Sequence, residues 1–250
     1  ILSFGDANRY GHIQGGVYPR DNFNAPDGEV PRSLPFADYA PSAYADQNGN
    51  IQTGSSTSTL QGKYVAIADT CGAISLSDAN GNINFGASGG TDCATPGFGG
   101  AGNTRASRTQ YYGVNLIKMK AMHFLPANTW LQGQVQDKVN LNKTCNAYWD
   151  GSALNFFRSG GGCNNTGEIP GVGLHEWGHG MDTNDGTAPS ATEYGTGETY
   201  GDFTATLQTH ESCTGGGFFQ SGNCSGYGAS CTNCTGIRDW SAEGRESCVF

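Results

Sequence analysis

The sequence predicts an α+β protein: a β-rich N-terminal region, residues 1–100, followed by residues 101–250, in which a mixed sheet is combined with helices. Two patterns predict this order. Residues that favour β-strands alternate along 63–69, and apolar residues recur every three or four positions from 104 to 125. With 40 glycines, 36% hydrophobic and 14% charged residues among 250, the composition fits a loop-rich globular chain.

The first hundred residues predict strands joined by turns. A strand is expected over residues 63–69, and two similar segments, 46–51 and 78–83, carry Asn-Gly pairs typical of hairpin turns. The Asp-x-Asn-x-Asn pattern in both segments also resembles the start of a calcium loop. No bidentate acid follows at the required distance, so turns are favoured. The glycine-rich residues 86–102 predict a boundary.

Helices and strands are expected to alternate after this boundary. The helix over 104–125 is stopped by Pro126, and a strand is expected over 130–139. The segment around Asn146 predicts the edge strand of the sheet. Two more helices are expected at about 171–181 and about 197–211, before a Cys- and Gly-rich tail with little regular structure.

Two histidines four residues apart, His175 and His179, form the most informative motif of the chain. On a helix they share one face, so that two imidazole nitrogens can point at a single ion. Glu176 follows the first histidine, Glu198 comes 19 residues after the second, and Asp202 lies one helical turn further on. Two imidazoles and a carboxylate are a common ligand set for catalytic zinc. A surface helix with solvated side chains, the alternative, does not explain a second acidic helix at this distance.

These residues resemble the gluzincin metallopeptidases, the thermolysin-like and fungalysin-like families. The segment G-E-T-Y-G-D-F at 197–203 is similar to the fungalysin segment G-E-G-W-x-D-F. The segment N-A-Y-W-D-G-S at 146–152 is similar to N-A-F-W-N-G-S, the edge strand with which thermolysin-like enzymes hold a peptide backbone. The resemblance covers roughly residues 104–240 and includes three motifs in the expected order. It implies a thermolysin-like zincin catalytic lobe with two active-site helices.

The resemblance implies a zinc-dependent endopeptidase that hydrolyses peptide bonds. Zn²⁺ is expected at His175, His179 and Glu198, with Glu176 as the general base toward a zinc-activated water. Asp202 is expected to accept a hydrogen bond from a ligand histidine and to fix its tautomer. The alternative for Asp202 is a charge on the helix surface.

The resemblance also implies substrate contacts at Asn146, Ala147 and Trp149, where an extended peptide can add to the sheet edge. Ordinary packing is the alternative for Trp149. One part of the family pattern is missing, a later histidine that steadies the oxyanion. His210 is 12 residues beyond Glu198 on the expected helix, or about 18 Å, which is too far from the ion. One expectation is therefore a chain that belongs to a longer protein, with its C-terminal lobe absent.

Two non-catalytic functions remain as alternatives. The chain can be a surface or structural protein built on a peptidase scaffold, or a module that binds an extended peptide along the Asn146 strand. A structural role does not require Glu176, because that residue binds no metal. The peptidase is therefore the favoured prediction.

Nine cysteines in a chain poor in lysine predict an oxidising compartment and a secreted protein. Cys71 is expected to pair with Cys93, and Cys145 with Cys163. Four of the remaining five can pair among themselves, leaving one thiol. The Cys231-x-x-Cys234 motif can also be half a zinc site or a redox motif, but disulfides are favoured. The remaining five are Cys213, Cys224, Cys231, Cys234 and Cys248.

The charge and hydropathy of the chain restrict its partners. A net charge of −9 argues against nucleic acid and anionic membranes, and no apolar run approaches the length of a membrane span. The first residue is not Met, which predicts a mature product after removal of a signal and propeptide. The expected partner is a protein or peptide substrate. Calcium is a second candidate cofactor at Asp182, Asn184 and Asp185, although a solvated loop explains these residues equally well.

Overall fold

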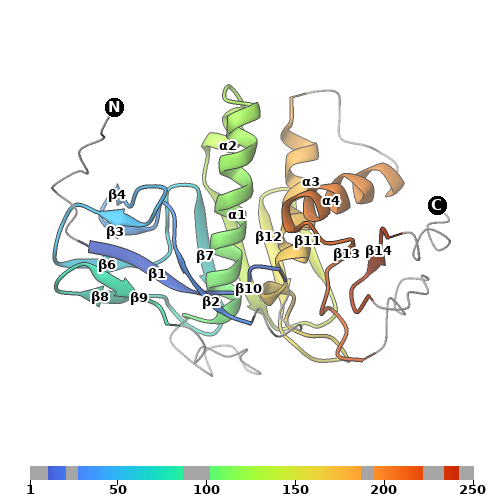
Figure 1. Ribbon diagram of the computed structural model, residues 1–250, viewed down its shortest axis with the longest axis horizontal. Helices are drawn as coiled ribbons and strands as arrows, with labels where there is room; N and C mark the ends of the chain where they lie inside the picture. Colours follow the sequence, from blue (N-terminus) through green and yellow to red (C-terminus); the bar gives the residue numbers. More distant parts are fainter. Residues whose placement is uncertain (1–10, 21–27, 87–101, 187–193, 222–233, 242–250) are drawn as a thin grey trace.

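The computed structural model describes residues 11–20, 28–86, 102–186, 194–221 and 234–241 (Figure 1). The protein is a mixed α/β structure with several sheets, compatible with the α+β class expected from the sequence. The predicted boundary at residue 100 lies outside the described residues. The described helices are α1 (Arg105–Phe124), α2 (Thr129–Gln132), η1 (Thr166–Glu168, a 3-10 helix), α3 (Pro170–Asn184) and α4 (Tyr194–Thr209).

The N-terminal residues form one four-stranded sheet around β1 (Gly11–Val17) and two strand pairs. Strand β1 pairs with β2 (Val30–Ser33) and β5 (Asn50–Ile51) in antiparallel orientation and with β9 (Asn82–Asn84) in parallel orientation. The two antiparallel pairs are β3 (Asp38–Ala40) with β4 (Ala43–Tyr44), and β6 (Ser56–Ser58) with β8 (Leu76–Asp78).

The two Asn-Gly segments form turns, but they do not form hairpins. In each turn an aspartate oxygen, Asp46 Oδ1 or Asp78 Oδ1, accepts hydrogen bonds from backbone amides two and four residues later. However, β8 and β9, which flank the second turn, pair with different strands. The hairpin prediction is wrong because strand partners are chosen by packing across the sheet, which the local turn pattern does not encode.

The second sheet is mixed and has the order β11-β12-β10-β7. Strands β7 (Val65–Asp69), β10 (Val135–Leu141) and β12 (Ala153–Phe157) are parallel, whereas β11 (Ala147–Trp149) is antiparallel to β12 and lies at the edge. The expected strand over 130–139 is wrong in its first half. Asn128 Oδ1 accepts a hydrogen bond from the Leu131 amide at 3.0 Å and caps the short helix α2, so β10 starts only at Val135.

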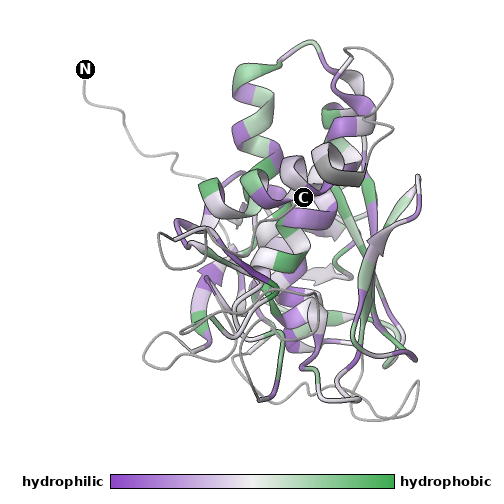
Figure 2. Cartoon of the chain, turned by 90° about the vertical axis from the view of Figure 1, so that its right-hand side faces the viewer, coloured by the Kyte–Doolittle hydropathy of each residue, from purple (hydrophilic) through white to green (hydrophobic). Residues whose placement is uncertain are grey.

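Helix α1 lies between the N-terminal strands and helices α3 and α4 (Figure 1). Thr104 caps its start, and Tyr111 and Val114 are buried in the core. Arg108 is fully buried and pairs with Glu29 at 2.6 Å, which ties the helix to the N-terminal strands. Hydrophobic and hydrophilic residues are mixed along the helices (Figure 2), and most of α3 is buried.

Two disulfides are fully described, Cys145–Cys163 and Cys213–Cys234. The first confirms the expected pairing. Cys71 is also disulfide-bonded, whereas its expected partner Cys93 lies outside the described residues. Such bonds are compatible with an extracellular protein. No helix in the described part of the chain is both long and apolar enough to cross a membrane.

Candidate metal centre

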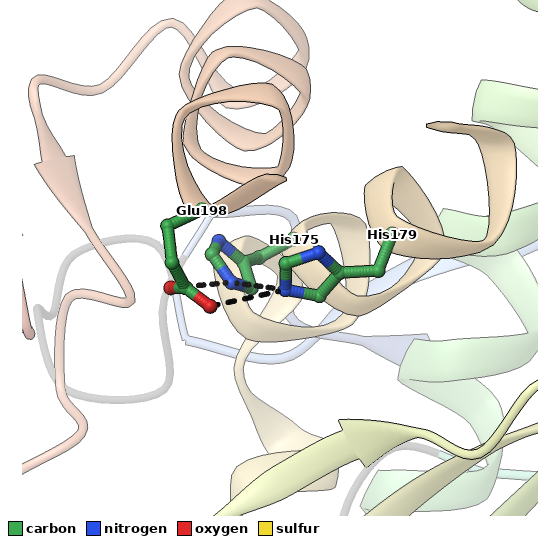
Figure 3. A group of neighbouring side chains, drawn as sticks. All are labelled: His175, His179 and Glu198. Carbon is green, nitrogen blue, oxygen red and sulfur yellow. Dashed lines mark hydrogen bonds and ion pairs between the residues drawn. The ribbon is translucent and has the colours of Figure 1, made fainter. Parts of the chain in front are cut away.

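Helices α3 and α4 bring three potential metal ligands together (Figure 3). His175 Nε2 lies 3.0 Å from His179 Nε2, and the carboxylate of Glu198 lies 3.4 Å from the first nitrogen and 3.5 Å from the second. All three ligand atoms lie within 4.8 Å of one another. Among the described residues, this is the one group of three or more histidine, cysteine or acidic side chains that could hold a metal ion.

Glycines allow the two helices to approach this closely. At Gly178, a Cβ would lie 2.8 Å from the Cα of Gly201, on the facing helix. At Gly201, a Cβ would lie 2.7 Å from Nδ1 of His175. Real Cβ atoms essentially never lie this close to a neighbour, so the packing of α3 on α4 requires both glycines.

Asp202 lies behind the first histidine. Its Oδ1 accepts a hydrogen bond from His175 Nδ1 at 2.8 Å, and the aspartate is almost fully buried. This contact places the proton of the ring on Nδ1 and leaves Nε2 free to bind a metal ion. Burial acts to raise the pKa of Asp202, but its hydrogen bonds to His175 and Arg238 outweigh burial and lower that pKa.

Arg238, which sequence reasoning missed, closes the far side of the cluster. It lies on β14 (Arg238–Asp239), which pairs with β13 (Cys213–Thr214). The Cys213–Cys234 disulfide links β13 to the segment that leads into β14. Its guanidinium donates to Glu198 at 3.0 Å and to both carboxylate oxygens of Asp202. After Glu198 the sequence contains two arginines, Arg238 and Arg245, and no lysine. The two carboxylates of Glu198 and Asp202 need a cation to balance them, and this need was the signal that could have identified an arginine at the site.

The charges around His175 favour a cation. Burial acts to lower the pKa of His175, but hydrogen bonds to Asp202 and Glu198 outweigh it and raise this pKa to about 10. Hydrogen bonds to His175 and His179 lower the pKa of Glu198. The carboxylates that would retain a proton on His175 also favour a divalent metal ion at the same position.

Glu176 points toward the edge of the sheet instead of joining the ligands. Its Oε2 accepts a hydrogen bond from the backbone amide of Trp149 at 3.2 Å, and the side chain is buried. Burial raises the pKa of Glu176, although His175, His179 and the Trp149 amide act in the opposite direction. A carboxylate held in this way can act as a base beside the metal position.

A cleft of about 340 Å³ contains the cluster. Strand β11 lines the cleft together with the apolar residues Val172 and Ile237. The structure therefore brings the expected substrate contacts Asn146, Ala147 and Trp149 into the same cleft as the ligands and Glu176. His210, His12 and His123 do not line it.

Trp149 also has a packing role. Its ring lies edge-on to Trp130, with ring centroids 6.0 Å apart, and its indole nitrogen is buried. Packing and substrate contact are therefore compatible at this position, because the backbone amide contacts Glu176 while the ring packs on Trp130.

The expected calcium ligands Asp182 and Asp185 do not belong to a group of three acidic or histidine side chains in the described part of the chain. Asn184 donates instead to the backbone oxygen of Gly180, one turn earlier in α3. Calcium binding there stays a prediction.

Comparison with known proteins found no match: no family model matches the chain, and no curated protein matches it.

Proposed function

We propose that the chain is a secreted zinc-dependent endopeptidase of the gluzincin type. The observation that carries this proposal is the convergence of His175, His179 and Glu198 next to Glu176, in one cleft with an exposed strand edge. A metal site alone does not need a separate buried carboxylate beside it. A catalytic site does, because a proton must leave the attacking water.

The ligand set fits zinc. Ligand atoms at about 2.1 Å from a tetrahedral zinc ion lie roughly 3.4 Å apart. The distances of His175 Nε2 and His179 Nε2 to the Glu198 carboxylate, 3.4 and 3.5 Å, agree with this value. Two imidazoles also favour zinc over magnesium or calcium, which prefer oxygen ligands.

When bound, zinc polarises the scissile carbonyl and lowers the pKa of water toward neutrality. Glu176 takes a proton from the attacking water and delivers it to the leaving amine. The Trp149 amide holds Oε2 of Glu176, which leaves Oε1 as the oxygen that would take the proton. Asp202 orients His175, and Arg238 holds Asp202 and Glu198 in place.

Strand β11 provides a binding site for substrate. Among the described strands β11 pairs with β12 alone, so an extended peptide can pair with its other edge next to the ligands. Val172 and Ile237 also line the cleft and favour an apolar substrate side chain. We expect cleavage next to aliphatic or aromatic residues, and faster cleavage of extended peptides than of helical ones.

The first experiment measures zinc content and cleavage of a library of quenched peptides by the wild-type chain, Glu176→Gln and Glu211→Gln. Glu211 is a matched control because it is exposed and pairs with Arg20 on the surface. We expect one zinc per chain in all three proteins and loss of cleavage in Glu176→Gln alone. The chelator-treated wild type is also expected to be inactive.

Peptide affinity, measured on the same three proteins, distinguishes the non-catalytic alternatives. A peptide-binding module retains peptide affinity but cleaves nothing, and Glu176→Gln leaves that affinity unchanged. A structural protein binds zinc but neither binds nor cleaves peptides. Either result would replace the peptidase proposal.

A further inference from the structure

A second concave surface lies away from the metal centre, between α1 and α4 with α3 as its floor. Helix α3 packs against both α1 and α4, and the groove does not include the metal ligands. Trp177 and Met181 of α3 form its floor, and both are almost fully buried. We call this surface the helix groove. Its other lining residues are Ile117, Lys120, Ala121, Phe124, Leu125, Tyr200, Phe203, Thr204, Leu207 and Gln208.

The walls of the helix groove expose large apolar side chains. Phe124 is 71% and Leu207 is 65% exposed, and Leu125 and Phe203 are also exposed. They are four of the six large hydrophobic side chains exposed in the described part of the chain. A small ligand would be enclosed by its site. Side chains that project this far into water require a broad surface to cover them, which indicates a protein partner.

The apolar area is appropriate for a dimer. From their exposed fractions, these four side chains leave roughly 400 Å² of apolar surface in water. A stable interface buries about 800 Å² on each partner, of which somewhat more than half is apolar. The helix groove therefore supplies nearly the whole apolar share of one side of such an interface.

Charges of both signs flank the helix groove. Lys120 is the one charged residue among those that line it, and its amine donates to Gln208 near the end of α4. Asp182 follows Met181 of the floor directly on α3 and is partly exposed. A two-fold axis across the groove would bring Lys120 of one copy toward Asp182 of the other.

We propose that the helix groove is the interface of a homodimer, in which α1 and α4 of one copy cover the same helices of the other. Leu207 and Phe124 pack in the centre. Lys120 of each protomer faces Asp182 of its partner. This interface is independent of the metal centre and of the proposed hydrolysis.

Sedimentation equilibrium at about 1 to 100 µM tests the proposal. We expect the wild type to form a reversible dimer, and Leu207→Asp and Phe124→Asp each to weaken it by at least tenfold. Tyr44→Asp is the control, because Tyr44 is an exposed aromatic residue on β4 outside the helix groove. Far-UV circular dichroism and zinc content show that each variant is folded.

Charge reversal tests the two-fold arrangement. Lys120→Asp is expected to weaken the dimer, and Asp182→Lys added to the same chain is expected to restore most of the lost affinity. A wild type that stays monomeric over this range would overturn the proposal, even if an apolar peptide binds to it. A dimer whose dissociation constant is unaffected by Leu207→Asp and Phe124→Asp would overturn it as well.

Discussion

The backbone amide of Trp149 donates a hydrogen bond to Oε2 of Glu176 at 3.2 Å. This bond joins the edge strand of the mixed sheet to the helix that carries the two histidines. The proposed general base is therefore positioned by the same strand on which we expect the substrate to bind. Its position depends on the main chain, since the Trp149 ring packs away against Trp130.

Glu176→Asp tests this arrangement. The shorter side chain cannot reach both the Trp149 amide and the attacking water. We expect kcat for a quenched peptide to fall at least about 100-fold, with KM and zinc content little changed. Steady-state kinetics of this variant and of the surface control Glu211→Asp check the prediction. A wild-type kcat in Glu176→Asp would show that the base is another group.

Gly201→Ala tests the close packing of α4 on His175. The added Cβ would lie 2.7 Å from His175 Nδ1, so the ring must shift away from the other ligands. We expect zinc affinity to fall at least about tenfold. Gly197→Ala is a matched control on the same helix, because nothing lies within 4 Å of its added Cβ. Competition with a fluorescent zinc chelator measures both affinities, and equal losses in the two variants would contradict the steric explanation.

Asp202→Asn tests the hydrogen bond behind His175. The amide can still accept a hydrogen bond but carries no charge, and it no longer balances Arg238. We expect zinc affinity to fall by about 10- to 100-fold. Asp182→Asn, at the end of α3, is expected to keep wild-type affinity. If zinc titrations find no difference between Asp202→Asn and wild type, the charge of Asp202 has no role in metal binding, although the side chain is buried behind His175.

Local patterns predicted the elements and residues whose positions depend on near neighbours. The helix expected over 104–125 forms as Arg105–Phe124, between the Thr104 cap and Pro126. His175 and His179 share a face because helical geometry places residues four apart together. The structure also brings Glu198 to them, from a second helix that the spacing after His179 and the family resemblance predict.

Contacts between distant segments could not be predicted in the same way. Arg238 comes 40 residues after Glu198 and reaches the cluster only because β14 pairs with β13 and Cys234 bonds to Cys213. The partners of β8 and β9 also depend on packing across the N-terminal sheets. A single sequence contains no periodic signal for such pairings, since each is decided by surfaces that form only when the chain folds.

Asp137 provides a test of stability that is independent of function. It lies on β10 in the centre of the mixed sheet, is fully buried, and neither carboxylate oxygen has a hydrogen-bond partner among the described residues. Burial raises the pKa of Asp137 well above its usual range. The folded chain therefore holds a proton that the unfolded chain releases above about pH 4. The free energy of unfolding decreases with pH across this window, by up to about 1.4 kcal/mol per unit until the folded pKa is reached.

Asp137→Asn removes this titration, so the variant should match wild type near pH 4 and become progressively more stable than wild type as the pH rises. Asp150→Asn is a control, because the pKa of Asp150 is shifted in the opposite direction to that of Asp137. Partial burial acts to raise the pKa of Asp150, but hydrogen bonds from Ser152, Asn155 and Ala153 outweigh it and lower that pKa. Asp150 therefore stabilises the fold above the unfolded pKa and loses this contribution as the pH falls, so Asp150→Asn should cost stability at neutral pH. Urea unfolding from pH 4 to 8 measures both variants. A constant difference between Asp137→Asn and wild type would mean that Asp137 has a partner that keeps it charged.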